Sequence, residues 1–292
     1  GIRDSVASRG LGDVYKRQFL DRAAQLTGET QQLLGDIAEL AESRYAVGKG
    51  IQADVLQVRV ARGLIEDKLL ELRASRSTAV SRLNLLLNRE PNSLVGLLRP
   101  WSPRMLTMTE ADLERIALER RGLLASLDHA KVQWEAEADV ARRESRPGFR
   151  FSAGYVQRAA AQDDPVRGGD FLMVQAALTI PIYRGRKQKQ KEIEALERAR
   201  EKTLERAWEV VRIRQKIREK VIQIRQHREQ HILYGTSILP QSEMAMSSAL
   251  SAYRVGRTDL SAVLEAHSAL LRSKLMNEHH RTAHAKSNAE LE

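Results

Sequence analysis

The sequence predicts a mainly α-helical fold with one β-hairpin, in which long antiparallel helical hairpins form two tandem repeats. The first observation is a duplication: RYAVGKGIQADVL at residues 44–56 recurs as AYRVGRTDLSAVL at residues 252–264, with shared Tyr, Val, Gly, Val and Leu at one constant offset. Second, apolar residues on both sides of each copy recur every three, four or seven positions, as in an amphipathic helix. Third, one central stretch alternates apolar and polar residues with the period of two that is typical of strands.

The composition favours narrow helical packing over a broad globular core. In 292 residues, aromatic content is 4% and charged content is 29%, and there is no cysteine. The missing cysteines exclude disulfides, thiolate zinc sites and cysteine catalysis. The net charge of +10 admits nucleic-acid binding. However, basic residues alternate with Glu along the helices and stacking aromatics are few, so we predict no nucleic acid partner.

The first repeat contains a helix, a turn and a second helix. Residues 1–18 show no apolar periodicity and resemble translated adapter sequence, so we expect a non-native segment there. Residues 19–90 are the first helical hairpin, in truncated form, with helices over 19–44 and 52–88. Gly48, like Gly256 in the second repeat, supplies the permissive backbone that a tight turn needs.

Three further segments follow in the chain. Residues 91–147 are predicted to be a linker with short helices, interrupted at Gly122. Residues 148–183 form a β-hairpin, with strands over 149–157 and 172–182 and a polar loop between them. Residues 184–292 are the second helical hairpin, with a kink or restart expected at Pro240.

The β-hairpin admits two interpretations. Strands of about 9 to 11 residues are long enough to span a membrane in a tilted barrel. A buried hairpin in a soluble domain is the other interpretation, and alternation alone favours it. No run of about 20 apolar residues is present, so a membrane crossing would need strands from other chains as well.

We call the turns at Gly48 and Gly256 the tips; each contains Tyr-x-Val-Gly. Along the chain, the first tip is followed by a proline-flanked linker, short helices, a β-hairpin that closes in Ile180-Pro-Ile-Tyr-Arg-Gly185, a long helix and the second tip. This order resembles that of the TolC-like outer-membrane efflux proteins. The resemblance implies a homotrimer with a trimeric α-helical barrel in the periplasm and a membrane β-barrel in the complete protein. It also implies that this chain lacks the N-terminal part. The implied location is the cell outer membrane, with helices extending into the periplasm, and the implied partners are a periplasmic adaptor (membrane fusion) protein and an inner-membrane pump.

The resemblance also implies site residues at the tips. A periplasmic gate is expected to contain Asp54, Tyr253, Arg257 and Glu265. Asp54 and Tyr253 match the family's positions, whereas Arg257 precedes the expected basic position and Glu265 is an acidic substitute one turn late. The expected adaptor contacts are Tyr45, Val47, Gly48, Val255 and Gly256. The alternative is that both tips are ordinary solvated turns, because surface ion pairs are common and weak.

No catalytic, cofactor or metal site is predicted. His227 and His231, and likewise His280 and His284, have the four-residue spacing of metal ligands on one helix face, but no carboxylate stands at a fixed spacing to complete a site. Packing or solvated histidines are therefore expected. The sequence predicts a non-enzyme: an outer-membrane channel subunit of a tripartite efflux or type I secretion system, a passive conduit for exported small molecules. The alternative function is a soluble coiled-coil scaffold that binds an acidic partner.

Overall fold

The computed structural model describes residues 2–96, 108–157, 169–180, 182 and 185–291. The chain divides into two compact units, Gly1–Ile116 with Arg214–Glu292 and Ala117–Ile213. The elements in chain order are α1 (Ile2–Ala46), α2 (Gln52–Leu86), α3 (Glu110–Arg120), α4 (Gly122–Glu144), β1 (Gly148–Val156), β2 (Phe171–Thr179), α5 (Gln188–Leu233), the π-helix η1 (Tyr234–Ile238), α6 (Leu239–Arg254) and α7 (Leu260–Leu291). The predicted mainly helical fold with one β-hairpin is confirmed. Among the described helices, none combines the length and the apolar character needed to cross a membrane.

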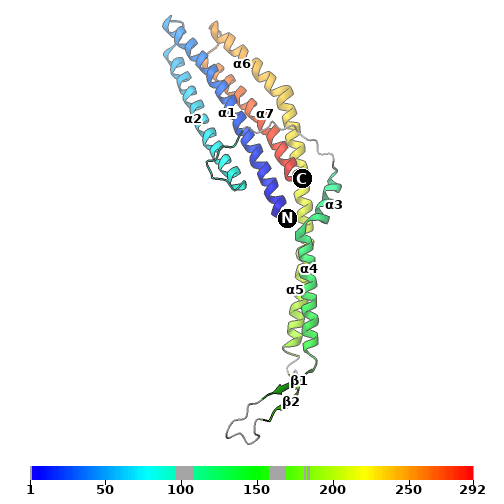
Figure 1. The fold of residues 1–292 in the computed structure, drawn as a ribbon. Helices are drawn as coiled ribbons and strands as arrows, with labels where there is room; N and C mark the ends of the chain where they lie inside the picture. Colours follow the sequence, from blue (N-terminus) through cyan, green and yellow to red (C-terminus); the bar gives the residue numbers. More distant parts are fainter. Residues whose placement is uncertain (1, 97–107, 158–168, 181, 183–184, 292) are drawn as a thin grey trace. The chain divides into compact units, whose positions relative to one another are not determined.

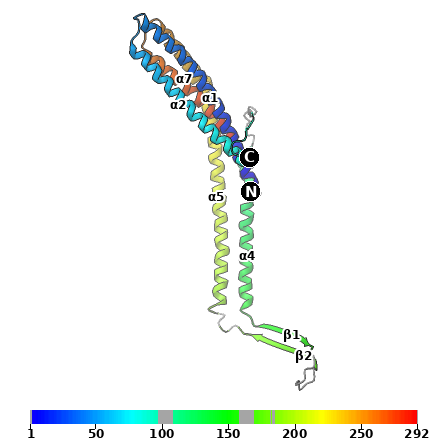
Figure 2. The same cartoon turned by 60° about the vertical axis from the view of Figure 1, so that its left-hand side comes forward.

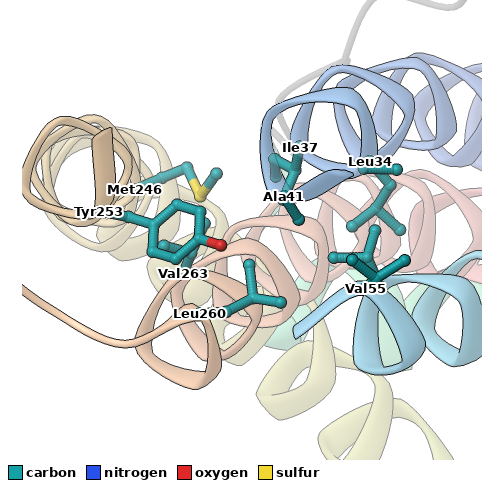
Figure 3. Packing of buried hydrophobic residues seen from close by; sticks show 10 residues of the cluster. Leu34, Ile37, Ala41, Val55, Met246, Tyr253, Leu260 and Val263 are labelled. Carbon is teal, nitrogen blue, oxygen red and sulfur yellow. The ribbon is translucent and has the colours of Figure 1, made fainter. Parts of the chain in front are cut away.

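The first unit is a layer of long helices (Figures 1 and 2). Helix α1 packs against both α2 and α7, and α7 packs in turn against α6. The α1–α2 turn and the α6–α7 turn lie at the same end of this unit (Figure 1). Near that end, apolar side chains from all four helices form one cluster (Figure 3). The core is thin because each helix contributes only a narrow apolar stripe.

The start of α1 differs from the sequence-based prediction. The pattern placed the first helical residue at Phe19, whereas α1 begins at Ile2. Tyr15 is buried with Ala285 and Ala289 of α7. Arg17 is also buried and donates hydrogen bonds to the carbonyls of Val95 and Gly96, both at 3.0 Å. The predicted helix start is wrong because these contacts are with distant parts of the chain, which local periodicity does not register. The non-native origin of residues 1–18 stays a prediction.

The long helical run of the second repeat restarts at Pro240, as expected. Helix α5 ends at Leu233, the π-helix follows, and Pro240 occupies the first turn of α6. Proline lacks the N–H that an uninterrupted helix would use there. The π-helix η1 directly precedes α6 and so accommodates that loss between the two α-helices.

The second unit contains the β-hairpin and the helices that carry it. β1 and β2 are antiparallel, with Phe149 opposite Leu178 and Tyr155 opposite Leu172. This register puts the predicted apolar residues of both strands on one face, which confirms the alternation argument. The face is exposed on the chain, with Phe151 76% and Val174 73% accessible. The loop at 162–168, with Pro181, Tyr183 and Arg184 of the quoted motif, lies outside the described residues.

Ion pairs join α4 to α5 in this unit. Arg206 Nε lies 2.8 Å from Asp128 Oδ1, and Arg142 Nε lies 2.9 Å from Glu192 Oε1. The buried apolar residues of these helices include Leu124, Ala138 and Ala141 of α4 and Ala195, Ala199 and Ile213 of α5. Helix α5 contributes residues to both units, because the division between them falls at Ile213.

Candidate functional site

The two tips have the same backbone turn. In the first tip, Lys49 N donates to Arg44 O at 2.8 Å and Gly48 N donates to Tyr45 O at 3.0 Å. In the second tip, the equivalent bonds run from the amides of residues 257 and 256 to the carbonyls of residues 252 and 253, at 2.9 and 3.0 Å. This pair of bonds is the Schellman motif, which ends a helix with a left-handed residue.

The glycines of both tips adopt the backbone conformation that the sequence predicted. Gly48 has φ of 71° and Gly256 has φ of 76°. L-residues other than glycine rarely adopt these angles, because Cβ then approaches the following carbonyl oxygen. The duplicated glycine is therefore explained by geometry at each turn.

The side chains of the two tips differ although their backbones match. Tyr45 of the first tip is 50% exposed, whereas its counterpart Tyr253 is only 2% exposed. The Tyr253 ring lies beside Met246 and Val263 in the apolar cluster (Figure 3). The second tip is thus anchored in the core through its tyrosine, and the first tip is not.

The buried tyrosine reaches across to the first repeat. Tyr253 Oη donates to Asp54 Oδ2 at 3.1 Å, which joins α6 to the first turn of α2. Burial raises the pKa of Tyr253 to about 12, and the hydrogen bond to the Asp54 carboxylate acts in the same direction. The hydroxyl therefore stays protonated and remains a donor over the whole physiological pH range.

Arg44 of α1 also contacts Tyr253, through both its carbonyl and its ring. Its Nη1 donates to the carbonyls of Tyr253 and Arg254, the latter at 3.2 Å, and its Nη2 donates to Lys49 O at 3.0 Å. The guanidinium carbon also lies 4.8 Å from the centroid of the Tyr253 ring. One side chain thus ties the carboxyl end of α6 to the α1–α2 turn, where the helix dipole favours a cation.

The structure brings together two of the four predicted gate residues. Asp54 and Tyr253 are in contact, whereas Arg257 and Glu265 are exposed and form no ion pair within the described part of the chain. The basic group beside Tyr253 is Arg44, which the sequence analysis did not select. Arg44 corresponds to Ala252 in the second repeat, so the duplication does not mark this position as functional.

The predicted adaptor-contact residues form exposed turn surfaces. Val47 is 66% exposed, Val255 is 69% exposed and Tyr45 is 50% exposed. Both valines directly precede the glycine of their tip. Apolar side chains this exposed on a turn are available for contact with another protein.

We expect that Arg44→Met lowers the free energy of unfolding by roughly 1–3 kcal/mol, because hydrogen bonds from a charged donor to three carbonyls are lost. Arg44→Lys should recover only part of the lost free energy, because an ammonium group cannot reach all the carbonyls that the planar guanidinium group contacts. Urea unfolding measures the effect. The control is Arg257→Met, an exposed tip arginine, for which a change within about ±0.5 kcal/mol is expected. A larger cost at Arg257 than at Arg44 would contradict the assignment.

The predicted histidine pairs come together between α5 and α7. His227 Nδ1 lies 3.3 Å from His280 Nδ1, and His231 Nδ1 lies 2.8 Å from Asn277 Oδ1. The ring of His279 stands edge-on to Phe19 and to His227. His280 Nε2 is buried and has no hydrogen-bond partner among the residues that the structure describes. Across the described residues, no group of three or more His, Asp or Glu side chains has an arrangement that holds a metal ion.

Comparison with solved structures gives three informative similarities. The outer-membrane channel OprN matches with a TM-score of 0.86 and 15% identity, over 99% of this chain and 65% of that chain. The outer membrane protein VceC from Vibrio cholerae matches with a TM-score of 0.85 and 18% identity, over 99% of this chain and 69% of that one. The Campylobacter jejuni CmeC outer membrane channel matches with a TM-score of 0.81 and 16% identity, over 99% of this chain and 62% of that chain.

These similarities concern the fold. No protein-family model matches the sequence, and a comparison with curated proteins also gives no match. This chain spans about two thirds of the length of the solved structures, as the 65% coverage of OprN shows. Each of the three matches covers 99% of this chain. The chain therefore has the fold of the TolC-like outer-membrane channels.

Proposed function

We propose that the chain is part of a subunit of an outer-membrane efflux channel, a passive conduit for exported small molecules that serves a tripartite efflux or type I secretion system. The observation that carries this proposal is the match over 99% of the chain to solved outer-membrane channels, at TM-scores of 0.81 to 0.86. The proteins in these comparisons are channels and not enzymes, which supports a transport role without catalysis.

The hairpin supports a location in the outer membrane. Each strand has 9 residues, which is within the length of about 9 to 11 residues that a tilted membrane strand requires. The face formed by Phe149, Phe151, Leu172 and Val174 is apolar and exposed. In water such a face is unfavourable, whereas lipid acyl chains would cover it. The helices of the first unit would then extend into the periplasm.

Exposed apolar side chains along the helices support a homotrimer. On α2, Val60 is 63% exposed and Leu64 is 66% exposed. On α5, Leu204, Trp208 and Val211 are similarly accessible. Helices packed side by side around a ring would bury stripes of this kind against the neighbouring copy, which a single chain has no means of doing.

The tips are the proposed contacts of a periplasmic adaptor, which would couple the channel to an inner-membrane pump. Val47 and Val255 project from two equivalent turns at one end of the first unit. The gate is proposed at the same end. Tyr253 and Asp54 are hydrogen-bonded within one chain, and we propose that the exposed Arg257 and Glu265 contact a neighbouring copy.

We expect Asp54→Ala combined with Tyr253→Phe to raise single-channel conductance, measured in planar bilayers with the whole protein that contains this chain. Each contact is worth about 0–1 kcal/mol, but threefold repetition adds these small energies into a bias of up to a few kcal/mol toward closure. High salt should reproduce part of the effect by screening the carboxylate. Tyr253→Phe keeps the ring, so mainly the hydrogen bond is lost.

The control for this experiment removes an exposed ion pair far from the tips, Lys68 with Glu71, whose charged atoms are 2.7 Å apart. Lys68→Ala with Glu71→Ala should leave conductance unchanged. If the tip variant conducts like the unmodified protein at every salt concentration, the gate assignment is wrong. If the unmodified protein forms no channels and sediments as a monomer without detergent, the channel proposal fails and the scaffold alternative is supported.

A further inference from the structure

Basic residues are concentrated where the hairpin joins its helices. Segments 142–150 and 185–191 together contain eight Lys and Arg residues and one Glu. The first segment covers the end of α4 and the start of β1, and the second leads into α5. This local excess contrasts with the helices, where basic and acidic residues alternate.

The two segments meet at the same end of the hairpin. Gly148, the first residue of β1, pairs with Thr179, the last residue of β2. A surface hollow of about 550 Å³ lies there, and its lining includes Arg143 and Arg146 together with both strand ends and Gln188. The polypeptide therefore gathers these cations around the base of the exposed apolar face.

Part of this charge is already neutralised within the chain. Arg142 pairs with Asp139 at 3.1 Å and with Glu192 at 2.9 Å. Lys191 pairs with Glu144, the one acidic residue that lines the hollow, at 3.5 Å. Six exposed basic side chains remain that form no ion pair in the part of the chain that the structure describes. Arg150 lies within β1, on the face opposite Phe149 and Phe151. We name the other five the basic collar: Arg143, Arg146, Arg186, Lys187 and Lys189.

We propose that the basic collar binds the anionic headgroups of phospholipids in the bilayer that receives the hairpin, which rests on the membrane location proposed above. A cluster of four to eight Lys and Arg immediately beside a membrane segment attracts acidic lipids strongly. The apolar face of the hairpin and the collar are adjacent in the chain, so acyl chains and headgroups of one lipid would meet them together. Arginine suits this role because its planar fork binds phosphate oxygens in pairs.

The collar also sets how deeply the hairpin inserts. Charged side chains stay at the headgroup level because burial in hydrocarbon is costly. The collar residues lie at the end of α4, before β1, and around the start of α5, so they mark the boundary between the strands and the aqueous helices. Long Lys and Arg side chains reach the interface while their methylene groups cover apolar surface.

The test is vesicle flotation of the full chain purified in detergent and then diluted. One set of vesicles contains phosphatidylcholine alone, and the other contains phosphatidylcholine mixed with phosphatidylglycerol. We expect the anionic lipid to increase partitioning of the unmodified chain by at least roughly tenfold. The triple variant Arg143→Gln, Arg146→Gln and Lys187→Gln should lose most of this increase, while its binding to phosphatidylcholine alone remains.

A matched control removes the same charge elsewhere, through Arg62→Gln, Arg73→Gln and Arg82→Gln, three exposed positions on α2. This variant should keep the full response to phosphatidylglycerol, and thermal unfolding followed by circular dichroism should show both variants folded. If the collar variant and the control respond equally, the collar proposal is overturned. If inorganic phosphate abolishes the response while chloride at equal ionic strength does not, the site binds phosphate ions and is not a lipid surface.

The outcome also separates this proposal from the channel proposal. An unmodified chain that binds phosphatidylcholine vesicles but gains nothing from phosphatidylglycerol contradicts the collar alone. A chain that binds neither vesicle contradicts the membrane location itself, and the collar proposal fails with it.

Discussion

Tyr253→Ala is expected to lower the free energy of unfolding by about 3–5 kcal/mol, the cost of removing a large aromatic ring from a core. Tyr253 is only 2% exposed, and it contacts residues from several helices through the apolar cluster at the tips. The substitution also removes the ring against which Arg44 is stacked and the donor to Asp54. Chemical denaturation of the purified chain, followed by circular dichroism, measures the change.

The duplication provides the control for this prediction. Tyr45 occupies the same position of the first repeat but is 50% exposed, so Tyr45→Ala is expected to change stability by no more than about 0.5 kcal/mol. Tyr253→Phe separates packing from hydrogen bonding, and we expect it to cost about 0.5–1.5 kcal/mol. Equal costs for Tyr45→Ala and Tyr253→Ala would show that the second tip is not anchored through its tyrosine.

Mild acid is expected to destabilise the first unit through its histidines. Burial lowers the pKa of His227, His267, His280 and His284 below the ordinary value of 6.5. The folded chain therefore holds these rings neutral, while the unfolded chain takes up protons near pH 6.5. Their contribution to stability is complete above that pH and is lost as the pH falls through 6.5 toward the lowered folded values.

The groups that face His280 lower its pKa further. After burial, the nearby His279, His227 and His231 oppose a positive charge on its ring. From the α5 side, Lys220 acts on His227 in the same sense and Gln230 opposes it through a hydrogen bond. On α7, Glu290 is already engaged by Lys220. A proton added to the cluster is therefore repelled by Lys220 and by any neighbouring ring that is already protonated.

The measurement is the melting temperature between about pH 7.5 and pH 5.5, above the range in which most carboxylates titrate. We expect a decrease of several degrees, given that each kcal/mol corresponds to about 2–4 °C in a chain of this size. His280→Gln should flatten the dependence, because a neutral side chain of similar length takes up no proton. The control His129→Gln removes an exposed histidine of α4. If both variants retain the full acid sensitivity, the histidine cluster is not its source.

The sequence by itself determined the features that depend on local geometry. A period of two placed Phe149 and Leu178 on one face of the hairpin, and the register agrees. The duplicated glycine marked each turn, because few other residues adopt a positive φ. Gly122 begins a new helix and Pro240 lies in the first turn of another, as their backbone chemistry requires. Each of these signals acts over a few residues, so a single sequence is enough to find it.

Only the tertiary structure decided which of the two equivalent tip tyrosines is buried. Tyr45 and Tyr253 both begin a Tyr-x-Val-Gly tip, yet Tyr45 is exposed and Tyr253 is buried and contacts Asp54 and Arg44. The burial of Tyr15 on α7 and the meeting of His227 with His280 are decided in the same way. These contacts join residues far apart in the chain, and a helix pattern fixes which face is apolar but not which helix covers it. That choice depends on the packing of all the helices together, which is why the repeat predicted the tips while only the fold distinguished them.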